Sequence, residues 1–218
     1  MLITNLEVQK KNTSRFSLYV DNNFVLGISA ATIAQYILYK GKTIEEDILK
    51  EISNFELLNR FFDRALGYIS GMMKSEFSIR TYLKDLAYKK KGDWFSEDYS
   101  EQVQAIIEKV IAKLKKYNYI NDKQYAQEFI QARLKYKPRS HLQLEQELYG
   151  KGIAKDIITD LLKDYSNSDT IYLVYKKKFG ETKIDKDDRK KIDFLARKGF
   201  SWDDISNLMK RMNDTGNN

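Results

Sequence analysis

The positively charged side chains between residues 130 and 144 are the part of this sequence best suited to binding a polyanion. No acidic residue occurs between Ile130 and Leu144, and an aromatic residue, Tyr136, lies among the cations. Such a segment can neutralise phosphates or pair with carboxylates, and the ring can stack on a base. The alternative is a solvated helix face. The candidate contact residues are Arg133, Lys135, Lys137 and Arg139.

A second basic cluster follows, in which three lysines are flanked by Tyr175 and Phe179. Its chemistry is the same, although the two rings are also typical of a helix core. Three further cations, at the ends of expected helices, are candidates for contact with a partner. There the helix dipole alone stabilises a cation by about 0.3–1 kcal/mol, so a structural role is the alternative. The lysines of the cluster and these three cations are Lys176, Lys177, Lys178, Lys151, Arg197 and Lys198.

The sequence lacks the residues that catalysis or metal binding requires. His141 is the only histidine and there is no cysteine, so a two-histidine metal site, a zinc ribbon and a histidine-oriented nucleophile are excluded. No glycine-rich loop is followed by the Lys-Ser/Thr of a phosphate-binding loop. The acidic residues at 185–188 lack the glycine and glutamate of a calcium loop and are expected to begin a helix. We therefore expect no enzymatic activity, cofactor or metal.

Composition favours a helical protein with a positive surface. The chain has 218 residues, of which 42% are hydrophobic and 32% charged, with a single proline, as is typical of helix-rich globular proteins. Lysine and arginine exceed aspartate and glutamate by 38 − 31 = 7, so the net field attracts polyanions or an acidic protein face. The sequence contains neither a signal peptide nor an apolar run of membrane-spanning length. We therefore expect a cytoplasmic protein.

The N-terminal residues 1–50 predict a small mixed module. Alternating apolar residues at 16–20 are followed by Asp21-Asn22-Asn23, residue types that tolerate the left-handed conformations of a tight hairpin turn. Residues 24–28 provide the second strand and residues 2–8 a third. Ser29 can cap a short helix that Gly41 is placed to end.

From Thr43 onward the sequence predicts helices. Thr43, Ser140 and Ser201 each precede a segment with helical apolar spacing, and a Glu, Gln or Asp follows each hydroxyl three residues later. Such a pair of side chains can satisfy the free backbone amides at the start of a helix. Three helix starts are therefore predicted at these hydroxyl residues.

Two loops are expected between the helices, at residues 88–100 and 166–170. The first contains three lysines that are either contacts for a partner or a solvated part of the loop. Both tryptophans are expected to anchor the core rather than an interface. These lysines and tryptophans are Lys89, Lys90, Lys91, Trp94 and Trp202.

A three-helix unit recurs along the chain. A shift of 198 − 151 = 47 residues superposes Lys151-Gly152 on Lys198-Gly199 and aligns apolar residues on either side. A shift of 139 − 74 = 65 residues aligns the segment from Lys74 with that from Arg139, which adds a first, less regular copy. Each glycine is expected to end a helix in the left-handed conformation. In the middle copy, helices are expected at about residues 122–136, 140–149 and 154–165.

The repeat decides the expected fold. One such unit buries too little surface to be stable alone, whereas neighbouring units share a continuous apolar core. We expect a mainly α fold in which tandem three-helix repeats form an elongated curved array, with a small N-terminal β-hairpin and helix module. The expected domains are the N-terminal module at 1–50 and helical repeats at 51–118, 119–166 and 167–218.

Several short segments occur in a characteristic order and spacing that covers nearly the whole chain. They are Arg15-Phe16 through Val20-Asp21-Asn22-Asn23-Phe24, Tyr119-Ile120-Asn121-Asp122 before Tyr125-Ala126, Pro138-Arg139-Ser140, Glu147-Leu148 with Lys151-Gly152-Ile153, and Phe194 through Ser201. None is diagnostic alone, but together they resemble the RecX family of bacterial recombination regulators. The lysine-rich segment around 88–100 and the irregular first repeat depart from the family pattern.

The resemblance implies tandem three-helix repeats and a regulator without chemistry of its own. Family members lodge in the helical groove of the RecA filament on DNA, where they inhibit ATP hydrolysis and strand exchange and oppose filament growth. The expected partners are therefore the RecA filament and single-stranded DNA, bound by a monomer that modulates recombination, DNA repair and the SOS response. Two alternatives remain open: a general nucleic-acid-binding helical-repeat protein, and a helical scaffold that binds another acidic protein.

Overall fold

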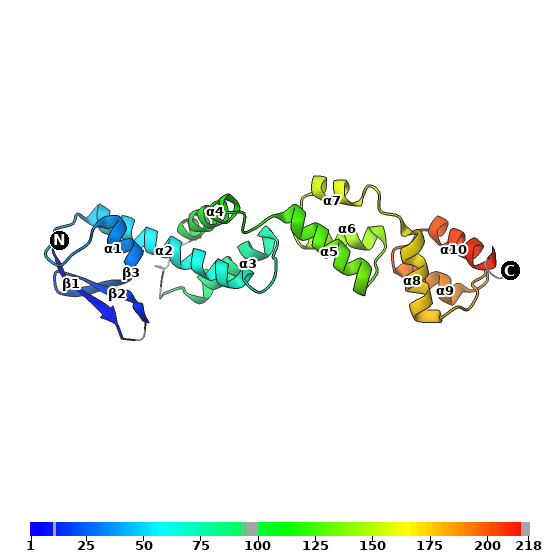
Figure 1. Cartoon of the computed structure of the whole chain (residues 1–218), viewed down its shortest axis with the longest axis horizontal. Coiled ribbons are helices and arrows are strands. Elements are labelled where there is room, and N and C mark those ends of the chain that lie inside the picture. The colour runs from blue at the N-terminus through cyan, green and yellow to red at the C-terminus, as the bar shows by residue number, and fades with distance from the viewer. Residues whose placement is uncertain (11, 93, 95–99, 215–218) are drawn as a thin grey trace. The chain divides into compact units, whose positions relative to one another are not determined.

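The structure is a computed structural model that describes residues 1–10, 12–92, 94 and 100–214. These ranges contain ten helices and a three-stranded sheet (Figure 1). The chain divides into two compact units: unit 1 comprises residues 1–72 and 80–119, and unit 2 comprises residues 73–79 and the chain from residue 120. The predicted mainly α class with an N-terminal β module is confirmed.

The sheet in unit 1 is built around a tight hairpin. Asp21 and Asn22 have φ values of 47° and 67°, as a two-residue turn with positive φ at both positions requires. The predicted hairpin and third strand are confirmed, and apolar residues such as Leu18 and Ile28 are buried beneath the sheet. The strands pair antiparallel in the order β1 (Ile3–Gln9), β2 (Asn12–Val20) and β3 (Asn23–Ser29).

The first helix, α1 (Ala30–Tyr36), begins at its predicted cap, Ser29, whose Oγ accepts a hydrogen bond from the third residue of the helix. The predicted end at Gly41 is wrong. The helix ends at Ile37, which has a φ of 48°. The N–H of Gly41 instead donates to the carbonyl oxygen of Ile3 at 2.8 Å, so this glycine ties the segment after the helix to the sheet.

The first long helix of unit 1 begins later than predicted. The hydroxyl of Thr43 does not cap a helix, because Thr43 pairs with Leu2 in an isolated β-bridge. The N-cap is Glu45, which makes no side-chain capping hydrogen bond. The buried face of the last helix, which includes Ile107 and Val110, packs on the first. The three helices are α2 (Glu46–Ile69), α3 (Glu76–Lys89), whose residues 76–79 belong to unit 2, and α4 (Ser100–Lys116).

Six helices follow in unit 2, as two sets of three. The middle repeat was predicted closely, and the loop predicted at 166–170 is wrong, because Ser166 caps a helix by accepting a hydrogen bond from the N–H of Ser168. The first set is α5 (Asp122–Tyr136), α6 (His141–Gly150) and α7 (Lys155–Leu162), and the second is α8 (Asn167–Phe179), α9 (Arg189–Arg197) and α10 (Trp202–Asp214).

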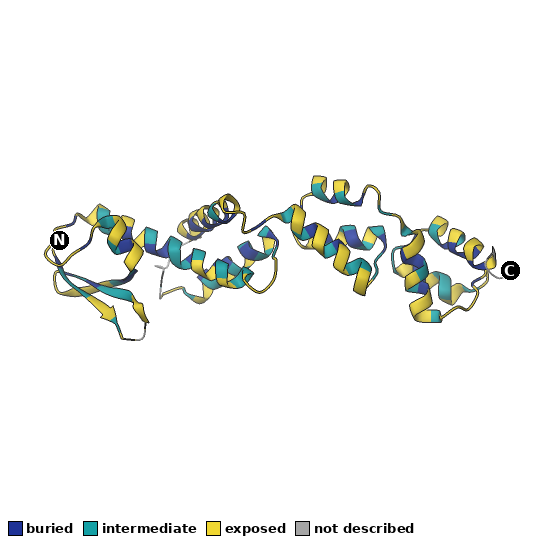
Figure 2. Ribbon diagram, in the orientation of Figure 1, coloured by how far each residue is buried: buried dark blue, intermediate teal, exposed yellow. Residues whose placement is uncertain are grey.

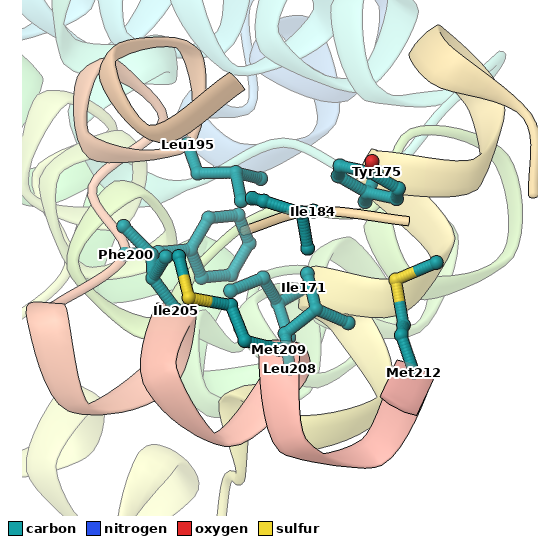
Figure 3. Close-up of a cluster of buried hydrophobic side chains, with 9 residues drawn as sticks. All are labelled: Ile171, Tyr175, Ile184, Leu195, Phe200, Ile205, Leu208, Met209 and Met212. Carbon is teal, nitrogen blue, oxygen red and sulfur yellow. The ribbon is translucent and has the colours of Figure 1, made fainter. Parts of the chain in front are cut away.

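Each set of three helices in unit 2 has its own apolar core (Figure 2). In the first set, Leu144 and Leu148 of α6 are buried against α5 and α7. In the second, nine buried side chains converge from α8, α9, α10 and the segments between them, with Tyr175 fully buried (Figure 3). These cores fix the faces that α5, α8 and α9 leave exposed.

The two predicted glycine turns end α6 and α9 in the same way. Gly152 and Gly199 have φ values of 74° and 77°, which glycine adopts at little cost. In each turn, the N–H of the following residue, Ile153 or Phe200, donates to a carbonyl oxygen five residues earlier. The predicted helix ends and the predicted cap at Ser201, which exchanges hydrogen bonds with Asp204, are therefore confirmed.

Candidate polyanion-binding groove

The two sets of helices in unit 2 are joined by hydrogen bonds at the start of α6. Ser140 caps α6 by accepting from the N–H of Gln143, as predicted, and its hydroxyl donates to the carbonyl oxygen of Lys198 at 2.7 Å. The N–H of His141 donates to Oδ1 of Asn167 at 2.8 Å. Ser140 is fully buried, so its hydrogen bonds are shielded from water. This junction holds the start of α8 and the end of α9 beside the start of α6.

Glycine allows the close approach at this junction. A Cβ atom on Gly199 would lie 2.7 Å from Oγ of Ser140 and 3.5 Å from the side chain of Leu142. The contact recurs one repeat earlier, where a Cβ on Gly152 would lie 2.3 Å from Cβ of Phe77. The two glycines therefore do more than end helices, because each also seats against the first turn of a helix in the preceding repeat.

A groove of about 630 Å³ lies between the end of α5, the second half of α8 and α9. Within the described part of the chain, no acidic side chain lines it. The groove brings together two basic clusters that lie about forty residues apart in the sequence, together with one helix-end lysine. The seven basic residues that line it are Lys135, Lys137, Arg139, Lys176, Lys177, Lys178 and Lys198.

Three predicted contact residues do not line this groove: Arg133, Lys151 and Arg197. Nε of Arg133 donates to Oε2 of Glu147 at 2.6 Å, and its guanidinium lies 4.7 Å from the ring centroid of Phe129. Lys151 is the C-cap of α6 and Arg197 is in the last turn of α9, where a cation is favoured by the helix dipole. Contact of these three residues with a partner stays a prediction.

Two of the groove cations have a carboxylate partner in the chain. Nε of Arg139 donates to Oε1 of Glu147 at 2.8 Å, so this carboxylate bridges Arg139 and Arg133. Lys176 pairs with Glu181, and the hydrogen bond between them raises the pKa of the lysine and lowers that of the glutamate. Among the described residues, no carboxylate forms an ion pair with Lys135, Lys137, Lys177, Lys178 or Lys198.

The floor of the groove is apolar, which sequence reasoning missed. Leu173 is 49% exposed although it lies two residues from fully buried positions of α8. The signal was present as helical spacing, since Leu173 and Val174 lie four residues before Lys177 and Lys178 and therefore share their faces of the helix. The apolar residues that line the groove are Leu134, Pro138, Leu173, Val174 and Phe194.

The remaining singled-out residues lie elsewhere. The ring of Trp94 packs on the buried ring of Phe61, with 6.1 Å between the two ring centroids, as expected for a core anchor. The same prediction is wrong for Trp202, which is 55% exposed because it is the first residue of α10, ahead of that helix's buried face.

His141 lies in the first turn of α6, and its ring centroid is 6.1 Å from that of Tyr165. Of the expected loop at 88–100, residues 93 and 95–99 lie outside the described residues.

Asp188 begins α9 as its N-cap, as was predicted for the acidic residues around it. Within the described ranges, no three His, Asp or Glu side chains gather in a way that could hold a metal ion. None of the described helices combines the length and the apolar character needed to cross a membrane.

Comparison with known proteins gives a consistent result. Family models for the regulatory protein RecX N-terminal domain and for the second three-helix domain of RecX match residues 1–45 and 121–162. A crystal structure of regulatory protein RecX superposes with a TM-score of 0.70 at 22% identity, covering 96% of this chain and 98% of that one, which shows the shared fold.

Two sequence relatives are each named regulatory protein RecX. The protein from Listeria monocytogenes is 28% identical over 167 residues, which are 77% of this chain and 57% of that protein, so this chain spans little more than half of its length. The protein from Clostridioides difficile is 31% identical over 220 residues, which cover 97% of this chain and 95% of that protein. By this near-full-length identity, the chain belongs to the RecX family of regulatory proteins.

Proposed function

We propose that this protein binds the RecA filament on single-stranded DNA and inhibits the ATPase activity, strand exchange and filament growth of RecA. In this way it modulates recombination, DNA repair and the SOS response. Membership of the RecX family supports the proposal. The observation that carries it is the groove in unit 2, where seven basic residues from two successive repeats face one space that no described acidic residue lines.

The chemistry of the groove suits regulation by contact. Five of its lysines have no carboxylate partner among the described residues, so their charges are available to another molecule. Unpaired surface charges steer an oppositely charged partner into contact and raise the association rate. A partner in this groove touches both repeats at once, because residues of both line it and the junction at Ser140 holds the start of α6 beside α8 and α9. Binding alone then changes the activity of the partner, and this protein catalyses no reaction.

The test is DNA-stimulated ATP hydrolysis by the RecA of the same organism, measured with substoichiometric amounts of this protein. We expect the rate to fall and the filaments seen by electron microscopy to shorten, because one bound regulator affects many protomers of a filament. No change in either quantity at stoichiometric amounts would contradict the proposal.

The same measurements separate the two alternatives. Binding to DNA that falls steeply between about 50 and 200 mM salt, without any effect on RecA, indicates a general nucleic-acid-binding protein, because counterion release produces that slope. Absence of both DNA binding and an effect on RecA indicates a scaffold for another acidic protein.

A further inference from the structure

The groove in unit 2 has an apolar floor that packs on the two helix cores. Leu134 packs against the core of α5–α7, whereas Val174 and Phe194 pack against the core of α8–α10. Leu173 lies beside them and is 49% exposed. An exposed leucine in a depression of about 630 Å³ is suited to covering by a bulky apolar group. The occupant therefore needs an apolar part as well as negative charge.

The cations around this floor are suited to carboxylates. Arginine is the residue type that binds a phosphate in bidentate geometry, but Arg139, the arginine that lines the groove, is already held by Glu147 and its side chain is 16% exposed. The unpaired cations are lysines, which act as point charges. The chain itself provides an example of the pairing we infer, since Lys176 binds Glu181 beside the groove.

Nucleobases fit the floor less well than aliphatic side chains do. Bases bind single-strand sites by stacking on aromatic planes. In the described part of the chain, two aromatic rings line the groove, and each lies beside a groove lysine: the ammonium of Lys135 is 5.1 Å from the ring centroid of Tyr136, and that of Lys198 is 5.7 Å from the ring centroid of Phe194. The rest of the floor is leucine, valine and proline. Such a surface packs well against leucine, isoleucine, methionine or phenylalanine.

We propose that the groove binds an extended acidic peptide segment of a protein partner, in which carboxylates flank at least one bulky apolar side chain. The apolar side chain lies on Leu173, Val174 and Phe194. The flanking carboxylates pair with Lys177, Lys178 and Lys198, on either side of this floor. The inference rests on the proposed function in one respect, which is that the groove is the site of partner contact.

The probe is a fluorescein-labelled peptide of about ten residues in which leucine recurs at every fourth position and glutamate fills the others, so that in an extended chain each leucine shares a face with glutamates two residues away. Two matched peptides replace either every leucine by alanine or every glutamate by glutamine. An oligothymidylate of equal charge serves as the competitor. By fluorescence anisotropy with the full chain, we expect the parent peptide to bind roughly tenfold or more tightly than either matched peptide.

Two double substitutions with the same change in charge locate the binding. Lys177→Glu with Lys178→Glu alters the groove, whereas Lys155→Glu with Lys210→Glu alters exposed positions of α7 and α10 that do not line it. We expect the first pair to weaken the parent peptide roughly tenfold or more and the second to leave it nearly unchanged. Leu173→Ser, at a half-exposed position that tolerates a polar residue, should reduce the parent peptide to the affinity of the alanine peptide.

Four outcomes would overturn the inference. Equal binding of the parent and alanine peptides would show that the floor holds no apolar anchor. Tighter binding of the oligothymidylate, unaffected by Leu173→Ser, would make the groove a nucleic-acid site. Equal loss with both double substitutions would place binding outside the groove. If the groove substitutions abolish RecA inhibition although no peptide binds, this inference fails and the proposed function stands. If the peptide binds but the protein does not inhibit RecA, the proposed function fails and this inference stands.

Discussion

Cationic side chains are used differently in unit 1 and in unit 2. In unit 1, Arg15 and the buried Glu56 form an ion pair of 2.7 Å, and Arg60 donates to the carbonyl oxygen of Gly27 at 2.8 Å. In unit 2, five of the lysines that line the open groove have no carboxylate partner among the described residues. A positive charge therefore indicates a binding site only when its partners are known: partly buried arginines bonded to Glu56 and Gly27 hold the sheet on α2, whereas unpaired lysines are available for binding.

The carboxylate of Glu56 is the centre of the buried cluster. It is 1% exposed and accepts hydrogen bonds from the N–H of Ser29 at 2.7 Å, from Arg15 at 2.7 Å and from the hydroxyl of Thr32. Burial alone raises the pKa of Glu56, but the hydrogen bonds from Thr32, Ser29 and Arg15 outweigh it and hold the pKa below its ordinary value.

The largest effect is expected from Glu56→Ala. The substitution removes the carboxylate that pairs with Arg15 and accepts hydrogen bonds from Ser29 and Thr32, and removing one partner of a buried ion pair costs about 3–5 kcal/mol. Urea unfolding followed by circular dichroism should show this loss in the transition of unit 1. The control is Glu51→Ala, at an exposed position of the same helix, which should change stability by less than about 0.5 kcal/mol. Equal effects of the two substitutions would contradict the structural role of the cluster.

A smaller loss is expected from Gly199→Ala, which disturbs the groove without altering any of its charges. The backbone has a φ of 77°, and the new Cβ would lie 2.7 Å from Oγ of Ser140. We expect a loss of roughly 1–3 kcal/mol in the unfolding of unit 2, with weaker binding to RecA filaments. Gly150→Ala, in α6 with open space around it, is the control and should be neutral or slightly stabilising. Unchanged stability and binding would show that the junction does not shape the groove.

Glu147→Ala tests whether pairing controls the availability of a cation. Its partly buried carboxylate bridges Arg133 and Arg139, so its loss should cost about 1 kcal/mol in unit 2. It also frees two guanidiniums, so binding to a polyanion should be kept or strengthened. Titration with filaments, using Glu128→Ala at an exposed position of α5 as the control, checks this expectation. Weaker binding would mean that Glu147 itself positions the contact surface.

The smallest predicted change is in the pH dependence of unit 1. Folding lowers the pKa of Glu56 from an ordinary value of 4.5. The contribution of Glu56 to the free energy of unfolding is therefore complete above that value and is lost as the pH falls through the pKa of the folded state. Between about pH 6 and pH 3, the free energy of unfolding should fall more steeply for the wild type than for Glu56→Gln. Parallel curves for the two proteins would show that Glu56 does not link stability to pH.

Features decided by neighbouring residues could be predicted from the sequence. The Asp21-Asn22 turn, the helix ends at Gly152 and Gly199 and the cap at Ser140 each depend on a few adjacent positions. The predictions at Thr43 and Gly41 failed because hydrogen bonds to β1 and its preceding residue, distant in the sequence, overrode the local pattern.

The groove itself required the structure. The basic residues on its rim were predicted, but their meeting depends on the hydrogen bond from Ser140 to Lys198, which spans 58 positions in the sequence. Glu147 was overlooked as the partner of Arg133 because it lies 14 residues away, on the next helix. The clusters of basic residues in the sequence therefore predicted which cations line the groove. They did not predict the apolar floor or which of the cations pair with a carboxylate.

The most direct test of the groove as the regulatory surface is RecA ATP hydrolysis with the two matched double substitutions. Lys177→Glu with Lys178→Glu should weaken inhibition by roughly tenfold or more in concentration, because it reverses charge within the groove. Lys155→Glu with Lys210→Glu carries the same change of net charge at exposed positions and should inhibit as the wild type does. Equal inhibition by both variants, with helicity intact, would contradict the assignment of the groove as the contact surface.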